Sequence, residues 1–142
     1  MEDKVIHENK TFTNVDYSEK SLRNREFVKC IFENCNFNNS DLRGNDFEDC
    51  IFKQCNLSMA LEEGKGFRNA VLDGCKLLGV DFTKCNKFSF SFSFKDSLLD
   101  FSNFYGTKLK NSTSFKEHFS NFVFFRSLSF GNSMHMPCSA WI

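Results

Sequence analysis

The 142-residue sequence predicts a repetitive solenoid in which the chain bends at fixed intervals. From Phe12 to Phe82, 14 of the 15 residues taken at every fifth position are Phe, Leu or Tyr, and Glu62 is the exception. The position two residues before each of these is mostly small, often Cys, Ser or Ala, and the residue between them is often Asn or Asp. A period of five matches neither the period of about 3.6 of a helix nor the period of about 2 of a strand. It indicates that each straight segment sends one large and one small side chain inward.

The large positions define the expected core. These residues are Phe27, Phe32, Phe37, Leu42, Phe47, Phe52, Leu57, Phe67, Leu72, Leu77 and Phe82. After Phe82 the register slips. We interpret Asn86 to Phe94 as a two-residue bulge and not as an isolated alternating strand, because Phe94, Leu99, Phe104 and Leu109 then restore the period in a new phase.

The pattern resembles the pentapeptide-repeat family, whose motif is a small residue, Asn or Asp, Leu or Phe, and two variable residues. Four segments show the motif: Cys35-Asn36-Phe37, Ser40-Asp41-Leu42, Asn45-Asp46-Phe47 and Cys55-Asn56-Leu57. The resemblance implies an all-β fold, a right-handed quadrilateral β-helix with four repeats, or about 20 residues, in each coil. Adjacent coils would stack at the strand spacing of about 4.8 Å.

The expected organisation is an N-terminal extension, a solenoid and a non-repeat Phe-rich tail. These cover residues 1–9, 10–110 and 111–142. In the tail, Ser114 to Glu117 has the form of a capping box, and Phe115, Phe119 and Phe122 follow at helical spacing. This favours a short helix over 115–126 that covers the last coil and forms a homodimer contact. A degraded continuation of the repeat, or a truncated or out-of-frame end, is the alternative.

Six of the seven cysteines occupy the small inward position: Cys30, Cys35, Cys50, Cys55, Cys75 and Cys85. Their spacing is not that of zinc ligands, so we expect buried, reduced thiols. His7, His118 and His135 are scattered, and the sequence contains no phosphate-binding loop or nucleophile elbow. We therefore expect no catalytic residues, no metal and no cofactor. The N-terminus lacks the pattern of a signal peptide, which predicts a cytoplasmic location.

The formal net charge of zero argues against direct binding to nucleic acid or an anionic membrane. Residues 20 apart should be neighbours on consecutive coils, and most charged pairs at this spacing are opposite in sign. These pairs are Lys29/Asp49, Glu33/Lys53, Lys53/Asp73, Arg43/Glu63 and Glu48/Arg68, against the like pairs Arg23/Arg43 and Glu26/Asp46. The pattern favours a mutually compensated surface.

The segment Cys55 to Ala60 is similar to the Qnr-type quinolone-resistance subgroup, which implies mimicry of DNA, binding to type II topoisomerase (DNA gyrase) and its protection from quinolones. The candidate interaction residues are Glu26, Asp41, Asp46, Glu62, Glu63 and Asp81. A DNA mimic of this size should display roughly a dozen negative charges, whereas residues 10–110 contain 14 acidic and 15 basic side chains. The alternative is a structural solenoid with another protein partner and no DNA-mimic role. For Glu62, which occupies a core position, we expect either a bulge that turns it outward or a distorted coil.

Overall fold

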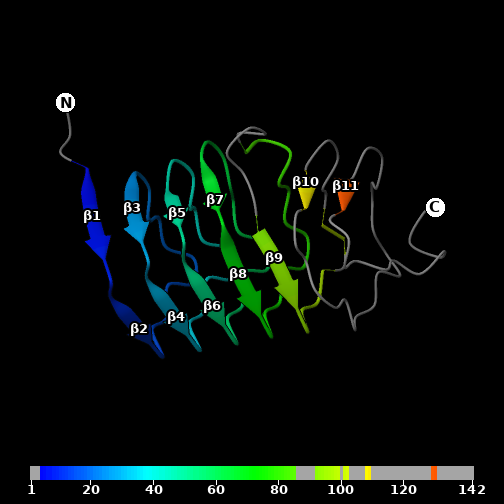
Figure 1. Cartoon of the computed structure of the whole chain (residues 1–142), viewed down its shortest axis with the longest axis horizontal. Coiled ribbons are helices and arrows are strands. Elements are labelled where there is room, and N and C mark those ends of the chain that lie inside the picture. Colours follow the sequence, from blue (N-terminus) through cyan, green and yellow to red (C-terminus); the bar gives the residue numbers. More distant parts are fainter. Residues whose placement is uncertain (1–3, 86–91, 100, 103–107, 110–128, 131–142) are drawn as a thin grey trace.

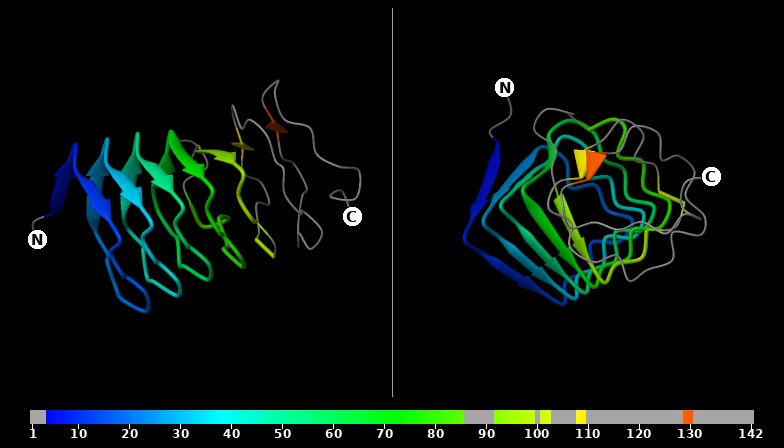
Figure 2. Two further views of the ribbon diagram at one scale, coloured as in Figure 1. Left: turned by 90° about the horizontal axis from the view of Figure 1, so that it is seen from below. Right: turned by 45° about the vertical axis from the view of Figure 1, so that its right-hand side comes forward.

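The chain forms a β-solenoid of short parallel strands that climb along one axis (Figures 1 and 2). The structure is a computed structural model and describes residues 4–85, 92–99, 101–102, 108–109 and 129–130. The strands of the solenoid are β1 (Val5–Glu8), β2 (Thr11–Thr13), β3 (Arg25–Val28), β4 (Ile31–Glu33), β5 (Asp46–Glu48), β6 (Ile51–Lys53), β7 (Gly66–Arg68), β8 (Ala70–Asp73) and β9 (Phe92–Lys95). The fold is the pentapeptide-type β-helix that the family resemblance implies.

Two parallel sheets and two lines of single bridges form the four sides of the coil. One sheet has the order β1-β3-β5-β7, and the other has the order β2-β4-β6-β8-β9. The third side is joined by bridges such as Asp16 to Asn36, and the fourth by bridges such as Ser21 to Asp41. Phe27 lies opposite Phe47, which lies opposite Phe67, so each coil contains 20 residues.

The bends between the sides have a single cause in the backbone. Every fifth residue from Asn9 to Gly79 has a positive φ, the left-handed conformation that turns the chain. The corner residues are Asn9, Asn14, Glu19, Asn24, Lys29, Asn34, Asn39, Gly44, Asp49, Gln54, Met59, Gly64, Asn69, Gly74 and Gly79. Asn and Gly tolerate this conformation best and supply most of these positions. The recurrence of Asn and Gly at every fifth position is therefore a further sequence signal for this coil.

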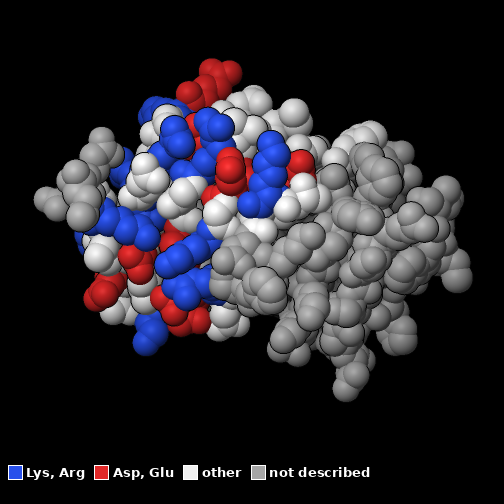
Figure 3. Space-filling view, turned by 90° about the horizontal axis from the view of Figure 1, so that it is seen from above, with Lys and Arg blue, Asp and Glu red and all other residues white. Residues whose placement is uncertain are grey.

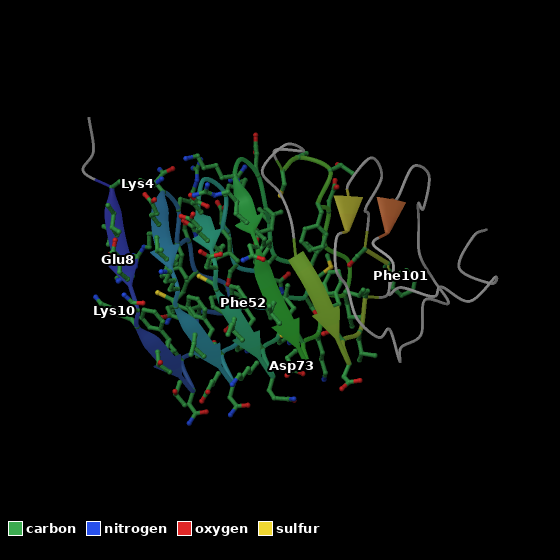
Figure 4. All side chains as sticks on the ribbon, viewed as in Figure 1. Lys4, Glu8, Lys10, Phe52, Asp73 and Phe101 are labelled. Atoms are coloured by element: carbon green, nitrogen blue, oxygen red, sulfur yellow. The ribbon has the colours of Figure 1, made fainter. Side chains whose placement is uncertain are left out.

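The interior of the coil is filled by columns of aromatic rings. All eleven residues expected in the core are buried, none with more than 5% of its surface exposed. Phe32 stacks on Phe52 with ring centroids 4.8 Å apart, and Phe27 stacks on Phe47 at 5.0 Å. Figure 4 shows Phe52 inside the coil, whereas Asp73 lies at the lower, outer end of β8. The ring separation equals the strand spacing of about 4.8 Å, so the backbone pitch itself brings the rings into contact.

Strand pairing begins earlier in the chain than the repeat does. Strand β1 lies before residue 10, where we expected the solenoid to start, and His7 pairs with Phe27. His7 is in phase with the series of large residues and stacks on Phe27 at 5.0 Å. A pattern search for Phe, Leu and Tyr does not find this position because histidine occupies it.

The register shift after Phe82 has the size that we expected. Gly64 pairs with Cys85, a spacing of 21, and Leu72 pairs with Phe94, a spacing of 22. Two residues are therefore inserted in this coil, and Phe94 and Leu99 return to the core with 1% of their surface exposed. The new phase of the repeat is confirmed at these two positions.

Most of the expected tail, including the helix over 115–126, lies outside the described residues. Within the described part, β10 (Lys108–Leu109) pairs in parallel with β11 (Ser129–Phe130). The tail boundary, the cap and the homodimer contact at that end stay predictions.

Candidate functional site

The acidic candidates lie on two neighbouring sides of the solenoid. Glu26 and Asp46 face each other on β3 and β5. The other four candidates belong to the fourth side, which the bridges from Ser21 to Asp41 and from Asp41 to Leu61 join. They are Asp41, Glu62, Glu63 and Asp81. The fold thus brings them near one edge of the coil, and their burial and partners decide which of them a binding partner can reach.

Asp46 is buried and forms the centre of an ion-pair cluster. Its carboxylate accepts hydrogen bonds from Nε and Nη2 of Arg68 at 2.9 and 2.7 Å, and Lys65 Nζ lies 4.0 Å away. Gly66 lies opposite Asp46 on the next coil. Arg68 also contacts Glu48 at 3.1 Å, so one cation serves two carboxylates. Asp46 is therefore unavailable to a partner.

Asp41 and Glu26 are neutralised nearer the surface. Nε and Nη2 of Arg43 each donate to a different oxygen of Asp41 at 2.8 Å, and Arg23 Nε lies 3.9 Å away. The hydrogen bond from the Arg43 side chain is the main cause that lowers the pKa of Asp41. Glu26 contacts Lys4 at 3.4 Å. Neither carboxylate presents an uncompensated negative charge.

Glu62 is buried in the core with 4% of its surface exposed, and neither carboxyl oxygen has a hydrogen-bond partner among the described residues. We expected a bulge that turns it outward or a distorted coil. The bulge is wrong: the bridge from Asp41 to Leu61 keeps the 20-residue spacing, and Glu62 points inward where Phe or Leu stands elsewhere. Burial, and secondarily the charge of Asp41, raises its pKa well above the usual value. This carboxyl is not part of an outer surface.

Glu63 and Asp81 are the remaining candidates, and both are exposed. Asp81 accepts hydrogen bonds from the backbone N–H and the hydroxyl of Thr83, which fix its carboxylate at the surface. In the view from above, where the chain turns into β3, β5 and β7, basic and acidic side chains are interspersed (Figure 3). Of the opposite-sign pairs expected at a spacing of 20, Glu48 and Arg68 come within ion-pair distance in the described part of the chain.

A scan against known families matches Pentapeptide repeats, in eight copies, over residues 26–58. This segment of the chain therefore consists of pentapeptide repeats. Proteins with this fold are generally non-enzymatic. A comparison with curated proteins gives no match.

Several solved structures are similar to this chain. A trypsin-treated variant of QnrB1, described as a plasmid-mediated fluoroquinolone resistance protein, has 23% identity and a TM-score of 0.44, covering 96% of this chain and 80% of its own. A second QnrB1 variant has 21% identity and a TM-score of 0.44, covering 89% and 78%. A pentapeptide-repeat protein of the Arabidopsis thaliana thylakoid lumen has 19% identity and a TM-score of 0.46, covering 76% and 70%.

The cysteines of the repeats tie one coil to the next. Each thiol from Cys30 to Cys75 donates to the carbonyl 23 residues earlier, for example Cys50 to Phe27 at 3.3 Å and Cys55 to Phe32 at 3.3 Å. Ser40 makes the same contact with Tyr17 at 2.6 Å. Burial raises the pKa of Cys50 to about 12. At these residues the small position therefore holds a compact buried donor that joins neighbouring coils.

The described residues show no candidate metal site and no candidate membrane span. Among the described residues, no three His, Cys, Asp or Glu side chains converge in a way that could hold a metal ion. The same part of the chain contains no helix long and apolar enough to cross a membrane. A shallow hollow at the N-terminal end is lined by the inward residues of the first coil, including His7, Phe12, Tyr17 and Leu22. Burial, together with Lys10 and Arg25, lowers the pKa of His7 there.

Proposed function

We propose that this chain is a non-enzymatic protein-binding module that acts through the flat outer sides of its solenoid. The observation that carries the proposal is that inward and outward side chains alternate along each strand and have different roles. Inward side chains fill the coil with stacked rings, as at Phe32 and Phe52. Outward side chains of the same strands repeat in register from coil to coil, as at Ile31 and Ile51. Such an array gives a partner a rigid surface with little entropy to lose on binding.

The charges favour a partner that does not need a DNA-like surface. Asp46 and Glu62 are buried, and Asp41 and Glu26 lie beside cations. Mimicry of duplex DNA would require a dense and uncompensated acidic face, since DNA carries one charge per roughly 1.7 Å of its axis. The scaffold version of the function, with a protein partner and no DNA mimicry, fits these residues better.

Binding to type II topoisomerase is the second candidate. It is favoured by the similarity of Cys55 to Ala60 to the Qnr-type subgroup, and Glu63 and Asp81 supply two exposed carboxylates on one side. A gyrase supercoiling assay with a fluoroquinolone, with and without the purified chain, separates the two functions. The scaffold function predicts no recovery of supercoiling.

The topoisomerase function predicts recovery by the wild-type chain and loss of that recovery in the double variant Glu63→Lys/Asp81→Lys. Lys76→Glu, an exposed substitution on a neighbouring side, is the matched control and should protect as well as the wild type. Recovery that depends on Glu63 and Asp81 would replace the scaffold function by the topoisomerase function.

We further propose that the chain works in a reducing compartment such as the cytoplasm. All six described cysteines are free thiols, and those from Cys30 to Cys75 donate to backbone carbonyls. Disulfides would replace these contacts. Labelling of free thiols in protein isolated from its native source tests this, with oxidised Cys55 as the result against it.

A further inference from the structure

The outer face of the sheet β2-β4-β6-β8-β9 carries a stripe of aliphatic side chains. Ile31, Ile51 and Val71 lie opposite one another on successive coils and point away from the core. The two isoleucines are partly exposed, and 37% of the surface of Val71 is exposed. We call these three residues the aliphatic stripe. A row of β-branched side chains on an otherwise polar side is an unpartnered apolar surface.

Charged residues border the aliphatic stripe on both edges. Two residues before the stripe, at the corner, stand Lys29 and Asp49; two residues after it, on the strand, stand Glu33 and Lys53. Along each edge the sign alternates from coil to coil. Within the described residues, none of these four side chains has an ion-pair partner within 4.0 Å.

We propose that this face binds a second copy of the same chain. The two copies would meet face to face about a two-fold axis that runs parallel to the solenoid axis over Ile51. This operation keeps the coils at equal height and reverses the strand direction. Each stripe residue then meets itself, and the residue two places before the stripe meets the residue two places after it.

The arrangement matches the charges without further adjustment. Lys29 lies opposite the partner's Glu33, and Asp49 lies opposite the partner's Lys53. By symmetry these become four ion pairs around an apolar centre, which is the isologous pattern of a two-fold interface.

Two neighbouring placements of the copies do not give this match. A two-fold axis along the strands through Ile51 inverts the order of the coils and brings Lys53 onto the partner's Lys53 and Glu33 onto the partner's Asp73. The same kind of axis midway between Ile31 and Ile51 would pair opposite charges, and the mixing experiment below separates it, because its mixture would keep two like-charge contacts. Moving the axis by one residue, over Phe52, places Ile51 against the partner's Lys53. The apolar stripe and its bordering charges are therefore complementary to the same face of another copy, and this self-complementarity points to a second copy as the occupant.

The contact is small, which sets the expected strength. The sheet has five strands at a spacing of about 4.8 Å, so the buried area falls below the roughly 800 Å² per partner of a standard interface. We expect a weak dimer with a dissociation constant on the order of 100 μM. Salt should weaken it, because the border pairs stay near solvent.

Sedimentation velocity of the full 142-residue chain over a concentration series tests the proposal. Ile51→Lys places two like charges at the axis and should weaken association at least tenfold. Met59→Lys, an equally drastic change at a residue that is 55% exposed on another side, should leave it unchanged. Thermal unfolding of each variant checks that the fold is retained, and Val71→Lys replaces Ile51→Lys if the latter does not fold.

A mixing experiment gives the sharpest result. Asp49→Lys and Lys53→Asp each place like charges across the axis and should abolish self-association. A mixture of the two variants restores opposite charges at both places and should associate as the wild type does, an outcome that simple destabilisation cannot produce. A wild-type chain that is monomeric at about ten times the expected dissociation constant, Ile51→Lys that associates unchanged, or a mixture that stays monomeric would each overturn the proposal. Unchanged association of Ile51→Lys would mean that the copies associate through another surface. The inference does not rest on the proposed function, because the gyrase assay and the mixing experiment test different surfaces.

Discussion

Asp46 and Glu62 are two buried carboxyl groups on neighbouring sides of the same solenoid, and they are accommodated in opposite ways. Asp46 is fully buried and accepts two hydrogen bonds from Arg68 at 2.9 and 2.7 Å. Glu62 is 4% exposed, and within the described part of the chain neither of its carboxyl oxygens has a hydrogen-bond partner. Asp46 lies on the outer side of its strand, where a cation can reach it, whereas Glu62 points into the column of core residues.

The difference shows that the direction of a side chain, outward or inward, decides whether its buried carboxyl group can pair with a cation. An outward residue can be covered by a long cationic side chain from the next coil, and the pair remains hydrogen-bonded. Burial of the inward Glu62, and secondarily the charge of Asp41, disfavours its charged form and raises its pKa. Three substitutions test this comparison. The largest loss of stability is expected at an apolar residue next to Asp46, and the effects at the two carboxyl groups are compared with that loss.

Replacement of Phe47 by Ala should lower the free energy of unfolding by about 3–5 kcal/mol. The Phe47 ring stacks between Phe27 and Phe67, at 5.0 and 5.3 Å, and its removal leaves a cavity in a column that cannot collapse. Denaturant unfolding measures the effect, and Glu48→Gln, on the neighbouring outward position, should cost under about 1 kcal/mol. Equal losses at the two positions would contradict the inward and outward assignment.

Replacement of Arg68 by Ala should cost about 2–3 kcal/mol, because it leaves the buried Asp46 without its hydrogen-bonded cation. Arg43→Ala removes the matching cation from Asp41, which water can solvate in its place, and should have a much smaller effect. The double variant Asp46→Asn/Arg68→Ala should recover part of the loss, since no buried charge is then left unpaired. If Arg68→Ala and Arg43→Ala unfold at the same denaturant concentration, burial of Asp46 has no energetic weight.

The core and the parallel coils could be predicted from sequence because the five-residue period depends on local chemistry alone. Phe47 repeats the environment of Phe27, so one inward assignment fixes the others. The two-residue shift before Phe94 could be found for the same reason. Strand β1 was missed because His7, and not an apolar residue, stands at its inward position.

The fate of the acidic candidates could not be read from the sequence. A spacing of 20 identified Glu48 and Arg68 as neighbours, but Arg68 makes its shortest contact diagonally, with Asp46 at a spacing of 22. That diagonal contact is a property of two coils together and does not follow from the repeat spacing. Glu62 could equally have turned outward, and the intact bridge at Leu61 decides against it.

Replacement of Glu62 by Leu should stabilise the chain by about 1–3 kcal/mol at neutral pH, because it removes an unpartnered buried carboxyl and restores the apolar column. Glu63→Leu, at the exposed neighbour, is the control and should leave the free energy of unfolding nearly unchanged. Unfolding by denaturant at a fixed pH measures both. A loss of stability in Glu62→Leu would mean that the carboxyl has a partner which the described contacts do not include.

The pH dependence of the same two proteins gives the sharper test. The ordinary pKa of Glu62 is 4.5, and its native value is raised. Below pH 4.5 the carboxyl is protonated in both the folded and the unfolded states, so its ionisation does not lower the free energy of unfolding. As the pH rises toward the native pKa, the unfolded chain releases a proton that the folded chain retains, so the wild type loses up to about 1.4 kcal/mol per pH unit. Glu62→Leu lacks this loss, and its advantage over the wild type should therefore widen steadily above pH 4.5. If the difference stays constant from pH 4.5 to neutrality, Glu62 ionises in the folded protein as easily as in the unfolded one, and water or a cation must reach the column beside Asp41.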